Sequence, residues 1–462
     1  MSTGGLVAAT SIDHLIVLFD QAFRALPRAV PMTEVERMAL LVNQSMAAAT
    51  RVFHTDSHVF NLCRGLQPLQ VLAALFHDVV YYQIDGGFPA SAAQLLVGVT
   101  RAHQGGLLLE SFAPEDQAVA LCADVFGFSS GQVLLLSAGM NEFLSAVVAA
   151  RLLQGHLDEP QLLAVVACIA ATVPFRDQDA AGQTAADTLA LRLRARCQQS
   201  ATALAGSNAA VDAFVKTVMT DAVTLANQDV AGFTDPDVRH CLSNTWLLLK
   251  ESNPSLRQAA VFGLQEYRAA LQRADTFLQQ LNPALICQSY DGYPAAAVCR
   301  ALTLAAARNI GFSRDYLAVE LSLIAIIEAL ALSTGGDCPA ALFLGESHAA
   351  TNPPCQTDAA LPLLPAAAAV NAELLALLDN EHLPGAINDL VRSPLKPWLY
   401  RLLGPAGIRQ TLQQARRMFQ GTCTAPAFLQ LQDRTLMLAI IRACQHNAPS
   451  RREALALLEN RI

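Results

Sequence analysis

The chain has 462 residues, of which 53% are hydrophobic and 15% are charged, so it can bury a large core in about two or three domains. Alanine and leucine dominate over β-branched and aromatic residues, which favours helices over sheets. The formal net charge of -8 argues against a general nucleic-acid binder or a binder of anionic membranes, although a local basic cleft is compatible with it.

Cysteine usage and hydropathy favour a cytoplasmic protein. The 11 cysteines include no Cys-x-x-Cys pair, and most stand among apolar residues, as is typical of reduced thiols in the cytosol. The first Lys or Arg is Arg24, and Asp13 precedes it, so the N-terminal segment is not predicted to be a secretory signal. The most apolar stretch, residues 316–332, is interrupted by Glu320 and Glu328, so we expect no membrane span.

Helical periodicity runs through most of the chain. Apolar residues recur on one face over residues 13–26, and Thr33 with Glu36 has the spacing of a capping box that starts a second helix, to about residue 50. Further helices are predicted over residues 139–153, 160–172, 211–230, 255–280, 294–309, 313–332, 361–379, 383–403, 405–419 and 426–446.

Two segments interrupt this pattern. Residues 83–138, punctuated by glycine and proline, are expected to form an insertion of short helices, and residues 333–360 a long loop. Because no alternating strand pattern recurs, the sequence predicts an all-α protein. We expect a helical bundle over residues 1–250, followed by a further helical region of unknown role over residues 251–462.

A histidine and a carboxylate stand side by side at His77 and Asp78, directly after the apolar run 69–76. Two more histidines precede this run: His54 is expected just before a helix start, and His58 in the first turn of that helix. Imidazole and carboxylate groups both suit Zn, Fe, Mn or Ni. The pattern therefore predicts a compact metal site, with His77 and Asp78 carried by a helix.

A distant carboxylate can complete this site. In the predicted helix 211–230, Asp229 continues the apolar face formed by Val218, Ala222 and Leu225. A carboxylate on a core-facing stripe is costly unless it is paired or bound to a metal. Asp221 in the same helix is the competing ligand.

Three ordered motifs strengthen this interpretation. They are Arg51-Val52-Phe53-His54-Thr55-Asp56-Ser57-His58, Phe76-His77-Asp78-Val79-Val80-Tyr81 and Asn141-Glu142-Phe143-Leu144-Ser145-Ala146, followed by the late Asp229. Over roughly residues 35–235 the chain resembles the HD superfamily of metal-dependent phosphohydrolases, and within it the bacterial group of predicted metal-dependent HD phosphohydrolases. It differs from that group at Phe53 and Thr55, where the group has Tyr and Asn, at Asn227, where an acidic residue is usual, and in the length of residues 83–138.

The resemblance implies a hydrolase that acts on ester bonds through metal-activated water. Its substrate would be a small phosphomonoester or phosphodiester, nucleotide-like in character. One divalent ion (Mn, Fe, Ni, Zn or Mg) would be held by the following ligands: His58, His77, Asp78 and Asp229. Asp78 would also bridge or orient at the metal, and Glu142 would serve as a general acid or base, or position the water. Arg51 and His54 would contact the phosphate.

Other interpretations remain open. An HD-type di-iron oxygenase would need further histidines, for which only His54 and His103 are available. A non-catalytic helical protein with a degenerate HD core would sense a ligand or bind a partner. The apolar C-terminal half is compatible with a homodimer interface, and core helices explain it equally well.

Overall fold

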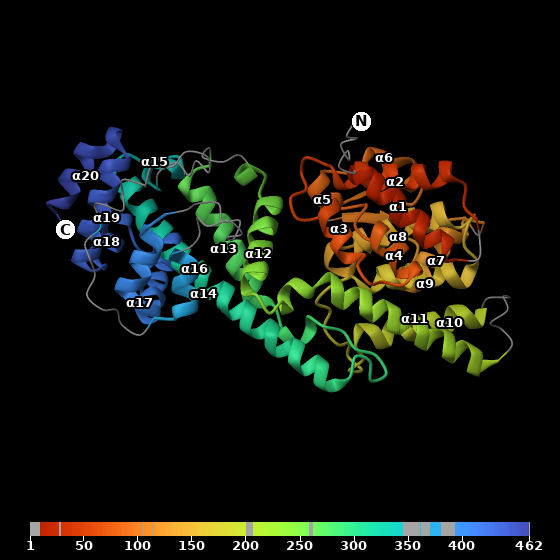
Figure 1. The fold of residues 1–462 in the computed structure, drawn as a ribbon. Coiled ribbons are helices and arrows are strands. Elements are labelled where there is room, and N and C mark those ends of the chain that lie inside the picture. Colours follow the sequence, from red (N-terminus) through yellow and green to blue (C-terminus); the bar gives the residue numbers. More distant parts are fainter. Residues whose placement is uncertain are drawn as a thin grey trace, which may run out of the picture. The chain divides into compact units, whose positions relative to one another are not determined.

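The computed structural model describes residues 10–26, 29–104, 106–113, 115–199, 207–257, 262–344, 361, 370–379 and 393–461. Most of these residues lie in α-helices, and the remainder includes one small three-stranded sheet (Figure 1). The predicted all-α class is confirmed.

The first of two compact units comprises residues 1–234 and 282–306. Its main helices are α1 (Ser11–Arg24), α2 (Met32–Met46), α3 (Asp56–Leu62), α4 (Pro68–Phe76), α7 (Gln117–Phe126), α8 (Met140–Leu153), α9 (Glu159–Ala171), α10 (Ala185–Gln199) and α11 (Asn208–Asp229). Helices α4, α8 and α9 are buried on nearly all sides, as their almost continuous apolar sequences require. Helix α11 packs against α9, and α1 packs against α2 and α4.

Capping residues decide where the site helices begin and end. Helix α4 starts with Pro68 in its first turn, behind a capping box formed by Gln67 and Gln70. It ends at Phe76, so His77 is its C-cap and Asp78 lies in the following turn. The predicted helix therefore ends one or two residues earlier than expected, although His77 keeps a helical backbone conformation and its N–H still donates to the carbonyl oxygen of Ala73.

The expected insertion, residues 83–138, contains the sheet. Strand β1 (Thr100–His103) pairs antiparallel with β2 (Gly106–Leu109), which pairs antiparallel with β3 (Val133–Leu134). Short helices α5 (Tyr82–Asp85) and α6 (Ala90–Ala93) precede it. These strands were missed because they are too short for a period of two to stand out from the sequence.

The second unit comprises residues 235–281 and 307–462. Its helices are α12 (Val238–Ser252), α13 (Leu264–Gln280), the C-terminal part of α14 (Ala296–Thr334), α15 (Ala340–Leu344), α16 (Ala372–Asp379), α17 (Leu395–Phe419), α18 (Ala425–Gln430), α19 (Arg434–Asn447) and α20 (Arg452–Glu459). The predicted boundary at residue 250 differs from this division. Helix α12 belongs to the second unit, because its fully buried Trp246 packs edge-on against Tyr316 of α14, with 6.1 Å between ring centroids.

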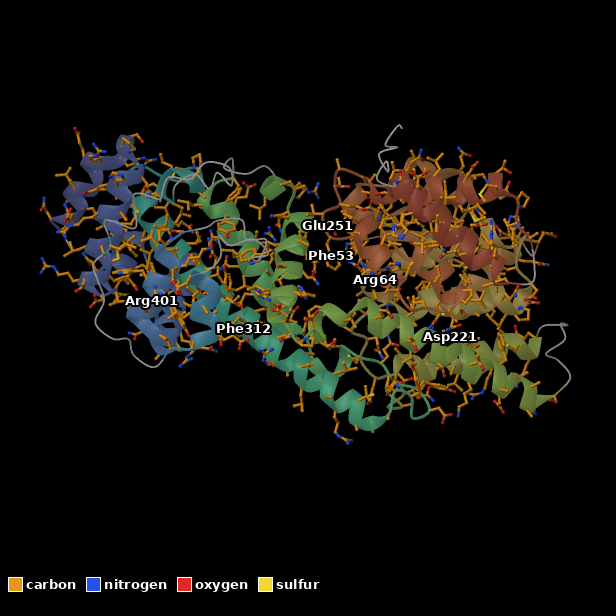
Figure 2. The ribbon with its side chains drawn as sticks, viewed as in Figure 1. Phe53, Arg64, Asp221, Glu251, Phe312 and Arg401 are labelled. Atoms are coloured by element: carbon orange, nitrogen blue, oxygen red, sulfur yellow. The ribbon has the colours of Figure 1, made fainter. Side chains whose placement is uncertain are left out.

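Helices α14 and α17 correct the expected breaks. The chain stays helical through Gly311, so the two helices predicted over 294–309 and 313–332 are one, and Phe312 lies inside it (Figure 2). The break expected near residue 404 is a kink within α17 at Gly404 and Pro405. The predicted helices 361–379 and 383–403 and the predicted loop 333–360 fall partly outside the described residues.

Helix α14 is long and apolar enough to cross a membrane by length and composition, but 78% of its most apolar window is buried inside the protein. Two of its acidic residues, Glu320 and Glu328, are paired with basic side chains. Glu320 Oε2 lies 2.7 Å from Lys396 Nζ with both side chains fully buried, and Glu328 Oε2 lies 2.9 Å from Arg268 Nε. These features are those of a core helix in a folded protein.

Candidate metal centre

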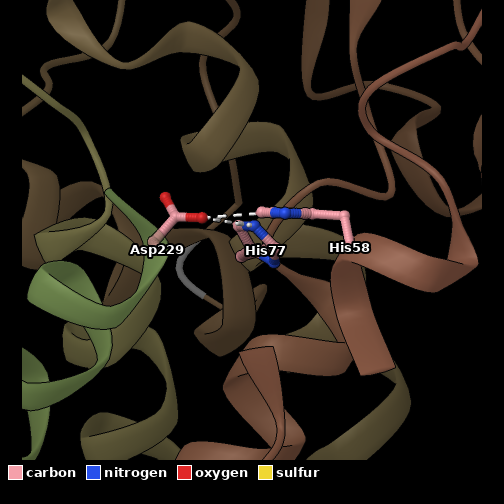
Figure 3. Close-up of side chains that lie close together, drawn as sticks. All are labelled: His58, His77 and Asp229. Atoms are coloured by element: carbon pink, nitrogen blue, oxygen red, sulfur yellow. Dashed lines mark ion pairs between the residues drawn. The ribbon is translucent and has the colours of Figure 1, made fainter. Parts of the chain in front are cut away.

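Three segments distant in sequence bring the predicted ligands together. His58 is in the first turn of α3, and His54 precedes that helix, as expected. His77 and Asp78 follow the end of α4, and Asp229 is the last residue of α11. Figure 3 shows the rings of His58 and His77 directed at the carboxylate of Asp229.

The donor atoms are close to one another. Asp229 Oδ1 lies 3.2 Å from His58 Nε2 and 3.6 Å from His77 Nε2. Asp78 Oδ2 lies 2.8 Å from His77 Nε2 and 3.8 Å from His58 Nε2. The donor atoms of His58, His77 and Asp229 all lie within 4.8 Å of one another. The predicted ligands His58, His77 and Asp229 therefore converge, and the carboxylate of Asp78 lies beside the ring nitrogens of the two histidines.

The two ring nitrogens at the centre are buried and have no hydrogen-bond partner of acceptable geometry. His77 Nδ1 lies 2.8 Å from the carbonyl oxygen of Ala74, which favours the tautomer that donates from Nδ1 and leaves a lone pair on Nε2. The exposed fraction of the His77 side chain is 2%, against 13% for His58 and 17% for Asp229. In the neutral ring this lone pair is the one that a metal ion would use.

A divalent ion fits this donor set. Metal–ligand distances of about 2.0 to 2.2 Å place neighbouring ligand atoms about 3 to 3.5 Å apart in tetrahedral or octahedral geometry. The distances between imidazole and carboxylate atoms, 2.8 to 3.8 Å, span this range. Two neutral imidazoles and two carboxylates would supply two negative charges, which suits a divalent cation of the first transition row.

The charges within the cluster are strongly coupled. Burial alone would lower the pKa of His77, but Asp78 and Asp229 outweigh it and raise that pKa well above its usual value. Burial alone would raise the pKa values of Asp78 and Asp229, but the neighbouring histidines lower both well below the usual value. Both carboxylates are therefore ionised at neutral pH and available to a cation.

Arg51 forms hydrogen bonds to the backbone of the turn that follows α4. Its fully buried guanidinium donates to the carbonyl oxygens of Asp78 at 2.6 Å and Val79 at 3.3 Å, and it pairs with Asp85 Oδ2 at 2.7 Å. The expectation that Arg51 contacts phosphate is wrong, because these partners occupy the guanidinium and its side chain is 0% exposed. Its role is to fix the backbone that presents His77 and Asp78.

Two side chains in the first turns of α8 form hydrogen bonds to the backbone of the same loop. Ser145 Oγ accepts from the backbone N–H of Val80 at 3.1 Å, and Asn141 Oδ1 accepts from that of Tyr82 at 3.1 Å. Asn141 and Ser145 are four residues apart and so share a helix face. This contact explains why the Asn-Glu-x-x-Ser pattern accompanies the His-Asp pair.

Glu142 lies between Asn141 and Ser145 in the sequence, and its charge interacts with those of Asp78, Asp229 and His77. The pKa of Glu142 is raised to about 7, mainly by burial and also by Asp78 and Asp229, while its own backbone hydrogen bond and His77 act in the opposite direction. A carboxyl group with a pKa near neutrality can donate or accept a proton at the pH of the cell. This placement agrees with the role predicted for Glu142.

His54 lies at the rim of the cluster. Its Nε2 is 4.0 Å from Asp78 Oδ2, and its ring packs against Tyr81 with 4.5 Å between centroids. Phe53, labelled in Figure 2, contacts the rings of both His54 and His58, at 4.9 and 5.1 Å between centroids. An aromatic wall therefore lies beside the donor atoms.

Side chains near the end of α11 fix the position of Asp229. Gln228 Nε2 donates to the carbonyl oxygens of Leu62 and Arg64 at the end of α3, and Asn227 Nδ2 donates to the carbonyl of Gln288. The competing ligand Asp221 lies earlier on α11 (Figure 2), and it is not among the three residues of the compact donor cluster. Asp229 is therefore the better candidate ligand.

Sequence reasoning missed Asp85 and Arg176. Asp85 is the carboxylate partner of Arg51, and Arg176 carries a charge that acts on Glu142. Neither has a motif of its own, since each is positioned only by the folded chain.

Comparisons with models of known protein families, with curated proteins and with solved structures found no match to this chain.

Proposed function

We propose that this protein is a metal-dependent phosphohydrolase of the HD type that acts on a small phosphomonoester or phosphodiester, with a nucleotide-like molecule as the expected substrate. The observation that carries the proposal is the convergence of His58, His77, Asp78 and Asp229, with two buried imidazole nitrogens that lack hydrogen-bond partners. The three ordered motifs and their resemblance to HD enzymes support the same conclusion.

Each group of the chain has a task in this proposal. A divalent ion held by the four ligands would lower the pKa of a bound water and neutralise charge on a phosphoryl group. Glu142, with a pKa of about 7, exchanges a proton with the attacking water or the leaving oxygen. His54 and Tyr81 flank the donor atoms and orient the substrate. Arg51, Asn141 and Ser145 keep the loop 77–82 in place.

The proposal is tested with full-length protein stripped of metal by a chelator and reloaded with Mn, Fe, Ni, Zn or Mg in turn. Turnover is measured on p-nitrophenyl phosphate and on a panel of nucleotides and phosphodiesters. We expect one or more of these ions to restore hydrolysis, and His77→Ala to abolish both stoichiometric metal binding and turnover. His240→Ala is the matched control, because that exposed histidine pairs with Asp235 and should leave both quantities unchanged.

The outcomes separate the alternatives. Metal binding without turnover on any substrate would overturn the hydrolase and favour the non-catalytic sensor. Protein that takes up no metal would also overturn the hydrolase and would favour the non-catalytic protein with a degenerate core. The di-iron oxygenase has less support, because His103 lies exposed on β1 and is not among the residues of the compact donor cluster. The cytoplasmic location and the homodimer stay predictions.

A further inference from the structure

Arg176 is a half-buried cation with little compensation. Its Nη2 donates to the carbonyl oxygen of Ala170 at 3.2 Å, while its Nε is buried and has no hydrogen-bond partner. Among the ion pairs of the described residues, none joins Arg176 to a carboxylate within 4.0 Å. A buried guanidinium with an unused N–H is costly, so this one has capacity for an anionic acceptor.

The segment that carries Arg176 is held rigidly beside the candidate metal centre. Phe175 has a φ of 56°, which is unfavourable for a residue with a large side chain. Its ring packs edge-on against Phe233, just after the end of α11, with 5.7 Å between centroids. Val173 lies against Gly139 at the N-terminus of α8, so close that a Cβ there would be 2.5 Å from Val173 Cγ2. The segment therefore packs against the N-terminus of the helix that carries Glu142 and against the turn that follows Asp229.

The electrostatic surroundings also suit an anion. Burial and the neighbouring Arg192 lower the pKa of Arg176, whereas Glu142 raises it. Arg192 donates to the carbonyl oxygen of Phe126 at 2.7 Å and brings no neutralising carboxylate with it. Of the charged groups that act on Arg176, Arg192 adds a second positive charge, and Glu142 is a carboxyl group that burial keeps partly protonated.

We propose that Arg176 binds an anionic oxygen of the substrate, of the kind carried by a phosphoryl group, next to Glu142. The inference rests on the proposed function for the identity of the substrate group. It assigns to Arg176 the contact that the sequence assigned to Arg51, whose guanidinium is occupied by Asp85 and two carbonyl oxygens. The planar fork of arginine matches two oxygens of a phosphoryl group, which a lysine does not.

The test uses metal-loaded, full-length protein with inorganic phosphate as the probe. Calorimetry gives the dissociation constant for phosphate, and competition with p-nitrophenyl phosphate gives KM and kcat. We expect Arg176→Gln to weaken phosphate binding and raise KM by roughly ten- to a hundredfold, with metal content and thermal unfolding unchanged. Arg176→Lys keeps the positive charge but loses the planar guanidinium group. Its phosphate affinity and KM should lie between those of Arg176→Gln and the wild type. Arg101→Gln, at an exposed arginine on β1, is the matched control.

Several results would overturn the proposal. These are a wild type that binds metal but not phosphate, or an Arg176→Gln protein with phosphate affinity and KM within about twofold of the wild type. If Arg176→Gln does not fold, unchanged affinity in Arg176→Lys has the same meaning. Phosphate binding that depends on Arg176 without hydrolysis would preserve this inference and remove the proposed function. Hydrolysis with an unchanged KM in Arg176→Gln would preserve the proposed function and remove this inference.

Discussion

Glu142 shows how one buried carboxyl group couples the candidate site to stability. Its pKa rises from an ordinary value of 4.5 to about 7 in the folded chain, so the folded state binds the proton more tightly than the unfolded state. The stability that this proton contributes is fully present below pH 4.5 and is lost as the pH rises to about 7. At 1.36 kcal/mol for each pKa unit, and allowing for partial exposure, the loss is about 1 to 3 kcal/mol.

In metal-free protein, Glu142→Gln should therefore be more stable than the wild type above pH 7 and equal to it near pH 4.5. Denaturant unfolding in the presence of a chelator, at a series of pH values, measures this difference. A constant difference at all pH values would show that the carboxyl group of Glu142 is not responsible. With metal and substrate present, the same variant should lose at least about a hundredfold in kcat, as expected for a proton-transfer group.

Arg51 positions the candidate site through hydrogen bonds to the backbone carbonyl oxygens of Asp78 and Val79. Arg51→Gln removes the charge that faces Asp85 and the donors to the carbonyls of Asp78 and Val79. We expect a loss of about 3 to 5 kcal/mol in unfolding free energy, because a buried carboxylate stays unpaired. Metal affinity should fall about ten- to a hundredfold, as for other residues that orient ligands. Arg37→Gln, which breaks an exposed pair with Glu34, should cost less than about 1 kcal/mol.

At the scale of elements, replacing either of two glycines by alanine should change the stability of the protein in opposite directions. Gly311 lies within α14 with open space around its missing Cβ, so Gly311→Ala should stabilise the protein by up to about 1 kcal/mol. Gly139, the N-cap of α8, has a φ of 91° and lies against Val173, so Gly139→Ala should destabilise it by more than that. Thermal unfolding of both variants checks the signs, and the same sign for both would contradict this assignment.

The same elements show what the sequence could predict. The convergence of these histidine and aspartate side chains was predictable, because each follows a strong local feature: a helix start, the end of an apolar run, or an apolar helix face. The role of Arg51 was not, because its partners are backbone oxygens and Asp85 in another segment. The break expected at Gly311 was wrong because buried neighbours on both sides, Ile310 and Phe312, hold the helix together.

At the scale of the whole molecule, the chain interleaves its two compact units. Residues 282–306 return to the first unit, where Gln288 donates to the carbonyl of Ala171 and pairs with Asn227. No local sequence pattern predicts that residues 282–306 pack in the first unit, since this depends on contacts between residues far apart in sequence. The consequence is that α14 begins in the unit with the candidate metal centre and ends in the unit with the buried Glu320–Lys396 pair.

This division predicts two separable unfolding transitions. A metal ion bound at the candidate centre is expected to stabilise only the first unit, by about 2.7 kcal/mol at a concentration one hundred times the dissociation constant. Lys396→Met removes the cation that lies 2.7 Å from Glu320 Oε2 in the second unit and should cost about 3 to 5 kcal/mol there. We therefore expect calorimetry to show one transition that metal raises and another that Lys396→Met lowers by on the order of 10 °C. Adding Glu320→Gln to Lys396→Met should recover much of that loss, because it removes the buried negative charge. A single transition that responds to both changes would mean instead that α14 couples the two units into one cooperative structure.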